Sequence, residues 1–115
     1  MRKLIESFKF AIQGIGYALN TERNMKIHFI LAFIVTLLGF WYHITASEWS
    51  VLLLTMSMVV TTEMVNTAIE KTIDLVTEEY KVLAKISKDV AAGAVFISSV
   101  VAIIIGVIIF YQKIF

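Results

Sequence analysis

The stretch WSVLLLTMSMVVTTEMVNTAIEKTID, Trp49 to Asp74, joins an apolar run to a charged motif. Its first part, residues 49–62, carries no charge, whereas residues 63–74 contain three acidic side chains and an amide. At about 1.5 Å per residue, the uncharged part covers only about 21 Å of a hydrocarbon core that is about 30 Å thick. If this segment crosses a membrane, part of the charged motif must lie inside it.

The composition supports a membrane protein. Hydrophobic residues make up 59% of the 115 residues, and the mean hydropathy is +0.85. Three apolar stretches, 27–46, 49–69 and 90–111, are each close to the roughly 20 residues that a spanning helix needs. We therefore predict an all-α membrane protein with three transmembrane helices, and a single domain that occupies residues 1–115.

Residues 1–20 precede these spans and have a different pattern. Apolar residues recur at helical spacing and charged residues occupy the other side, which predicts an amphipathic helix on the membrane surface. Two roles remain open for this helix, because it could simply anchor the chain or could also form one wall of an active site.

The distribution of basic residues predicts the orientation. Lysines and arginines precede the first span and lie between the second and third, so these ends are expected to face the cytoplasm. The net charge of +1 is too small to indicate a nucleic-acid partner. The chain has no cysteine and therefore no thiolate nucleophile or disulfide.

The acidic motif forms one helical face. At 100° per residue, Glu63, Asn66, Glu70 and Asp74 fall within about 80° of one another. Glu63 would lie about 9 Å inside the cytoplasmic boundary, where an ionisable side chain costs about 2.5 to 3.5 kcal/mol and normally faces a protein interior or a wet cavity. A solvated helix end is the alternative explanation, and it suits Asp74 better than Glu63.

Two further polar clusters are expected at the same membrane surface. One consists of Glu22, Arg23 and Asn24, and the other of Lys88 and Asp89. Carboxylates near an interface suit Mg²⁺, a lysine can hold phosphate, and a carboxylate can remove a proton from a hydroxyl. These groups together indicate phosphoryl transfer. Alternatively, Lys88 and Asp89 only pair with each other at a helix start.

His28 lies near the start of the first predicted span. A lone histidine at a membrane boundary is more often an interfacial hydrogen-bonding residue than a ligand.

Three segments, ALNTERNMKIH (18–28), EMVNTAIEKTIDLV (63–76) and AKISKDVAAGAV (84–95), match a known pattern. Through them the chain resembles the prokaryotic diacylglycerol kinase and undecaprenol kinase family of small membrane lipid kinases. The resemblance implies that ATP is the phosphoryl donor, that Glu63 is the catalytic base, and that Glu22 and Glu70 hold Mg²⁺. It also implies a homotrimer with sites shared between neighbouring chains.

The resemblance implies roles for the other polar residues as well. Asn66 and Asp74 would line the site as polar support, and Glu63 and Asn24 are expected to meet the lipid alcohol. The implied nucleotide-binding residues are Lys88, Asp89, Glu79, Lys3 and Phe10. The last two stand where the family has an arginine and a tyrosine.

The segment TERN, residues 21–24, looks like the Gram-positive branch of the family, whose members favour undecaprenol. We therefore expect an undecaprenol kinase in a bacterial cell membrane, with its N-terminus and active site in the cytoplasm. Diacylglycerol is the alternative substrate. A small transporter that uses Glu63 as its binding site is a more distant alternative.

Overall fold

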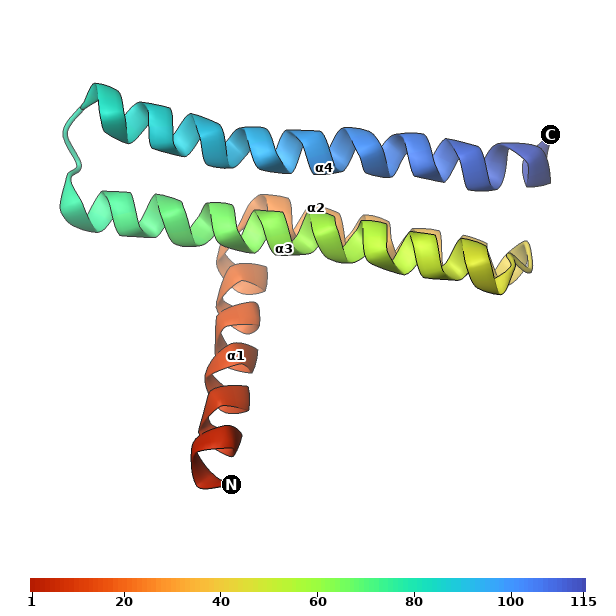
Figure 1. The fold of residues 1–115 in the computed structure, drawn as a ribbon, viewed down its shortest axis with the longest axis horizontal. Coiled ribbons are helices and arrows are strands. Elements are labelled where there is room, and N and C mark those ends of the chain that lie inside the picture. The colour runs from red at the N-terminus through yellow and green to blue at the C-terminus, as the bar shows by residue number, and fades with distance from the viewer.

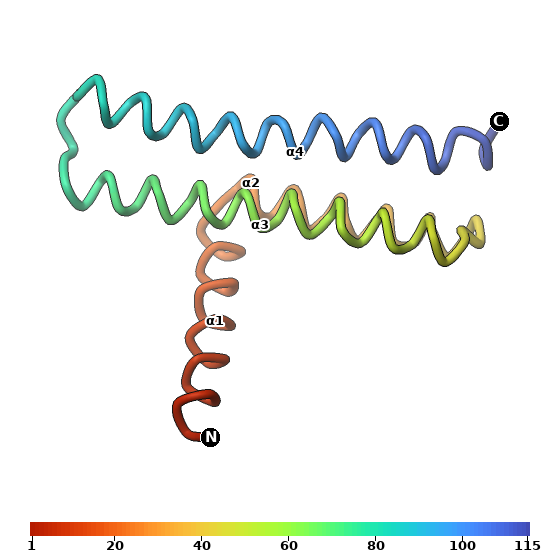
Figure 2. The backbone as a smooth tube through the Cα atoms, viewed as in Figure 1, coloured from red at the N-terminus to blue at the C-terminus, as the bar shows by residue number.

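The computed structural model describes residues 1–115 as four helices (Figure 1). They are α1 (Arg2–Thr21), α2 (Arg23–Trp41), α3 (Ala46–Val76) and α4 (Val82–Ile114). The predicted all-α class is thus confirmed. The helices α3 and α4 run antiparallel and side by side, α2 packs along α3, and α1 projects crosswise from the other three (Figures 1 and 2).

Three of the helices are long and apolar enough to cross a membrane, namely α2, α3 and α4. With 31 and 33 residues, α3 and α4 are about 46 Å and about 50 Å long, which exceeds a hydrocarbon core of about 30 Å. Both therefore continue as regular helix beyond the predicted spans 49–69 and 90–111. The extra turns carry the polar residues at the C-terminal end of α3 and the N-terminal end of α4.

The first predicted span, 27–46, differs from the helix that is formed. The helix α2 begins at Arg23 and ends at Trp41, and Ala46 already belongs to α3. The chain turns between them because His43 has a φ of 52°, a left-handed conformation that an α-helix does not contain. Residues 27–46 contain no Asp, Glu, Lys or Arg, so the distribution of charge alone does not show this turn.

Local hydrogen bonds fix the two ends of α2. At its start, Glu22 is extended and forms the corner between α1 and α2, donating its N–H to Ala18 O at 2.9 Å. Beyond its end, Thr45 and Glu48 form a capping box that starts α3, in which each backbone N–H donates to the other's side-chain oxygen. The corner at Glu22 places an acidic side chain at the C-terminal end of α1.

The packed apolar core lies at the end of the bundle that contains the α2–α3 turn. Its buried members come from that turn, α3 and α4, and they are Ile44, Leu52, Ile109 and Phe110. Only 14 of the 115 residues are buried, and large apolar side chains cover most of the remaining surface. Such a surface must be covered by lipid or by other protein chains.

Candidate active site

Glu63 is the most enclosed charged residue of the chain. It lies on the face of α3 that packs against α2, and it is 3% exposed. Its Oε2 lies 3.7 Å from Nε2 of His28 on α2. That distance is too long for a hydrogen bond, and Oε2 is buried without any hydrogen-bond partner. A carboxylate oxygen without a partner in such a place is an unusual and costly feature.

Asn66 and Glu70 continue the same polar face toward the end of α3. Asn66 is buried, and its Nδ2 donates to Oε1 of Glu70 at 3.3 Å. The other amide atom, Oδ1, is buried and has no partner. Two acceptor oxygens one helical turn apart, on Glu63 and Asn66, thus remain free to bind a proton donor or a cation.

The corner between α1 and α2 brings in another carboxylate. Oε1 of Glu22 lies 3.8 Å from Nζ of Lys71, the residue that follows Glu70 on α3. The charges of Glu22 and Glu70 both lie close enough to Glu63 to act on it electrostatically. Acidic side chains from two separate segments of the sequence therefore converge on one region.

A second polar group lies where α3 and α4 approach their connecting loop. Nζ of Lys88 donates to Oδ1 of Asp74 at 2.7 Å, which links the two helices. Asp89 pairs with Lys85 on α4. Lys88, Asp89 and Lys85 border a hollow of about 380 Å³ that is lined by both helices and by the loop, including Glu79.

Two of the predicted site residues lie apart from these groups within one chain, and a third makes no side-chain hydrogen bond to them. Lys3 and Phe10 belong to the N-terminal half of α1, which projects away from the other helices (Figure 1). Phe10 is 64% exposed. Asn24 is exposed at the start of α2. Their predicted contacts with nucleotide and lipid therefore remain predictions.

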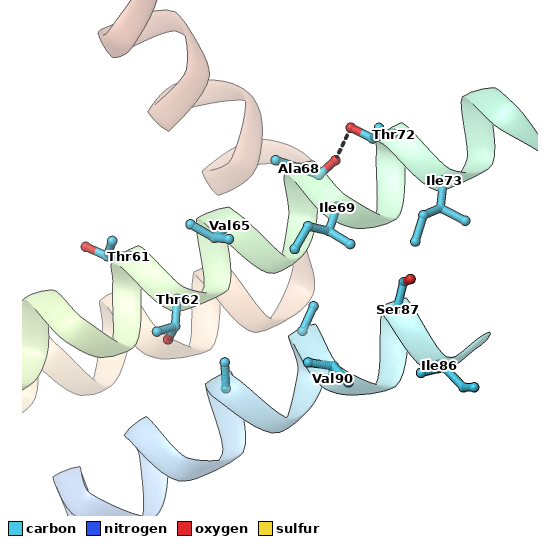
Figure 3. A pocket seen from close by; sticks show the side chains of 12 residues that line it. Thr61, Thr62, Val65, Ala68, Ile69, Thr72, Ile73, Ile86, Ser87 and Val90 are labelled. Atoms are coloured by element: carbon cyan, nitrogen blue, oxygen red, sulfur yellow. Dashed lines mark hydrogen bonds between the residues drawn. The ribbon is translucent and has the colours of Figure 1, made fainter. Parts of the chain in front are cut away.

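A larger groove of about 840 Å³ lies between α3 and α4 (Figure 3). In it Ile69 and Ile73 of α3 face Ser87 and Val90 of α4. No ionisable side chain lines this groove, so it cannot supply a base or a phosphate-binding cation. The ionisable side chains described above lie outside this groove.

The donor atoms near Glu63 are of the kind that Mg²⁺ prefers. Carboxylate and amide oxygens are hard ligands, and Asn66, which donates to the Glu70 carboxylate through Nδ2, keeps its Oδ1 without a partner. Within one chain, no three His, Asp or Glu side chains are close enough to enclose an ion. Mg²⁺ commonly uses one or two carboxylates together with substrate phosphates and waters, so this donor set fits.

Sequence reasoning missed one member of this region, His28, which it interpreted as an interfacial hydrogen-bonding residue. The structure places its side chain 15% exposed against Glu63. The only available signal was that both residues fall in long apolar segments. Contact between them depends on how α2 packs along α3, which helical periodicity does not determine.

The chain is similar to known proteins along most of its length. Residues 9–110 match the family model described as prokaryotic diacylglycerol kinase. The chain is 39% identical to the undecaprenol kinase of Bacillus subtilis over 113 residues, which cover 98% of this chain and 92% of that protein.

It is also similar to two proteins named diacylglycerol kinase. Identity to the one from Synechocystis is 41% over 104 residues, covering 90% of this chain and 59% of that protein. Identity to the one from Haemophilus influenzae is 30% over 109 residues, covering 94% and 92%.

Proposed function

Because this chain belongs to the prokaryotic diacylglycerol kinase family of membrane lipid kinases, we propose that it transfers the γ-phosphoryl group of ATP to undecaprenol. The observation that carries this proposal is the buried carboxylate of Glu63 within a membrane-spanning helix, with the charges of Glu22 and Glu70 nearby. The similarity to an undecaprenol kinase over nearly the whole of both chains favours undecaprenol. The similarity to diacylglycerol kinases makes diacylglycerol the second candidate.

In the proposed reaction, Glu63 accepts the proton of the lipid hydroxyl. The hydroxyl oxygen forms a bond to the γ-phosphorus, and the bond from that phosphorus to the β-bridging oxygen breaks, so that ADP leaves. A base at the lipid boundary suits this reaction because the alcohol of a long-chain lipid reaches only the interface. Proton removal by a positioned carboxylate contributes about 10²- to 10⁴-fold to such rates.

Glu22 and Glu70 would hold Mg²⁺, and the unpaired Oδ1 of Asn66, whose Nδ2 donates to Glu70, could add a further oxygen ligand. When bound, Mg²⁺ would neutralise charge on the transferred phosphoryl group. The carboxylates themselves require such a partner, because Lys71 reaches only Glu22 and at a distance of 3.8 Å. Acidic groups gathered at the edge of a low-dielectric region repel one another unless a cation joins them.

Lys88 would bind the phosphates of ATP, with Asp89 and Glu79 nearby. Its compact ammonium group suits phosphate, and its hydrogen bond to Asp74 fixes the direction of its flexible stem. The hollow of about 380 Å³ beside these residues provides space next to the lysine. In this proposal Asp74 supports Lys88 and Asn66 supports Glu70, each through the hydrogen bond between the two side chains.

We also propose that residues 1–115 form one integral-membrane domain that assembles as a homotrimer. The sparse burial within one chain supports assembly, because a neighbour could cover part of the exposed apolar surface. Lys3 and Phe10 project away from Lys88 of their own chain, so they would meet the nucleotide of an adjacent chain. The basic residues near α1 and the α3–α4 loop support a cytoplasmic site in a bacterial membrane.

The test uses purified protein, Mg²⁺ and ATP labelled on the γ-phosphate, in mixed micelles that contain undecaprenol, diacylglycerol or no added lipid. We expect label in the lipid product with undecaprenol, less with diacylglycerol, and none in the E63Q variant. Efficient labelling of diacylglycerol alone would reverse the substrate assignment. If neither lipid is labelled, the proposed function is wrong.

A further inference from the structure

We propose that His28 is a positioning residue for Glu63, and that its Nε2 holds Oε2 so that Oε1 accepts the proton of the lipid hydroxyl. This inference rests on the proposed function and adds a second residue to the proton-accepting site. Its basis is the approach of the two side chains across the α2–α3 interface, at 3.7 Å, with exposed fractions of 15% for His28 and 3% for Glu63.

The two oxygens of Glu63 have different surroundings. Oε2 is fully enclosed and lacks a hydrogen-bond partner. Oε1 is not one of the fully enclosed oxygens that lack a partner. The enclosed oxygen is the one that faces the imidazole. An interaction with His28 would therefore occupy the oxygen that a substrate could not reach and would leave the other for catalysis.

The burial of Glu63 makes such a partner necessary. A carboxylate removed from water is destabilised unless a donor or a positive charge compensates it. Lys71 and Lys88 cannot take this role, because their ammonium groups pair with Glu22 and Asp74. His28 is the basic side chain that the structure places against the Glu63 carboxylate.

The separation of 3.7 Å is slightly longer than a hydrogen bond. Catalytic hydrogen bonds are often long before substrate binds and shorten in the reactive complex. A small rotation of either side chain would bring Nε2–H and Oε2 together. In the reaction the lipid O–H bond breaks and its proton moves to Oε1 of Glu63, while His28 keeps its own proton and fixes the carboxylate plane.

The matched test compares H28Q with H28M. Both side chains have about the length of histidine, but only glutamine has an N–H donor near the position of Nε2. We expect H28M to lower kcat by about 10- to 100-fold, as a misplaced catalytic group does, with the KM values for ATP and lipid unchanged. The H28Q variant should recover most of the lost kcat.

The second histidine of the chain supplies the control. His43 lies in the α2–α3 turn, at the opposite end of α2 from His28. Asparagine tolerates the left-handed backbone conformation of this position. The H43N variant should therefore keep wild-type kcat. Thermal unfolding and oligomer size, measured in the same micelles, should be the same for H28M and H28Q, and if H28M does not fold, the kcat of H28Q decides.

Several results would overturn the inference. One is wild-type kcat in H28M, and another is an equal loss in H28M and H28Q, because the imidazole would then act by packing alone. A change confined to KM, or a loss of kcat in H28Q alone, would also contradict it. If the wild-type protein labels no lipid, the proposed function fails as well. If both the wild type and H28M are fully active, the lipid kinase function stands and only the role of His28 is rejected.

Discussion

Replacing Glu63 by glutamine is expected to abolish turnover while leaving the fold at least as stable. The side chain is 3% exposed within a spanning helix, where a charge costs about 2.5 to 3.5 kcal/mol. Because Oε2 makes no hydrogen bond and His28 is 3.7 Å away, much of this cost is not compensated. Glutamine keeps the shape and removes the charge, so E63Q should gain up to about 2 kcal/mol in free energy of unfolding.

Activity should change in the opposite direction. Glutamine cannot accept the hydroxyl proton, and loss of a general base lowers kcat by about 10²- to 10⁴-fold. Labelled-ATP assays and denaturant unfolding in the same micelles measure the two effects together. Binding of ATP should persist, because the proposed phosphate-binding residues lie elsewhere.

The same substitution at Glu48 supplies a control on the same helix. Glu48 lies in the first turn of α3, accepts the N–H of Thr45 and pairs with Lys113 at 3.3 Å. Removing its charge should lower stability and leave kcat unchanged, the reverse of the E63Q pattern. Near-normal turnover in E63Q would refute the assignment of the base, and a clear loss of stability would refute the view that the carboxylate is poorly compensated.

Two other substitutions test separate parts of the structure. A Cβ added at Gly39 would lie 2.7 Å from Cη2 of Trp49, so G39A should destabilise the protein by about 1 to 3 kcal/mol in denaturant unfolding. The matched variant G14A meets no atom within 4 Å and should be neutral or slightly stabilising, and equal effects of the two would contradict the packing. The D74N variant weakens the hydrogen bond that orients Lys88 and should raise the KM for ATP in the kinase assay. Its unfolding temperature should hardly change because both side chains are about half exposed, and an unchanged KM would separate this pair from nucleotide binding.

The sequence was sufficient to predict the helical class and the membrane spans, but not all of the helix ends. Uninterrupted apolar stretches of the right length have few alternatives in a membrane, because each backbone group must be satisfied within its own segment. The end of α2 was missed because its turn contains neither proline nor a glycine with positive φ. His43 adopts the left-handed conformation instead, inside a run that contains no Asp, Glu, Lys or Arg.

The candidate site was predictable along each helix and not between helices. Helical periodicity alone places Glu63, Asn66 and Glu70 on one face, since it depends only on spacing. The contact of Glu63 with His28 depends on the rotation and register of α2 against α3. Those are set by packing over the whole interface, including parts remote from the site.

The distribution of packing along the bundle explains how stability and access can coexist. A groove of about 840 Å³ opens between α3 and α4 at the level of Thr62 and Ser87, so these two helices are not sealed together in the half of the bundle that carries the polar residues. The apolar core around Leu52 and Phe110 holds the same helices at the opposite end. Because Gly39 lies at that packed end, G39A should lower stability without lowering kcat in the protein that remains folded, and a proportional loss of kcat would show that the two ends are coupled.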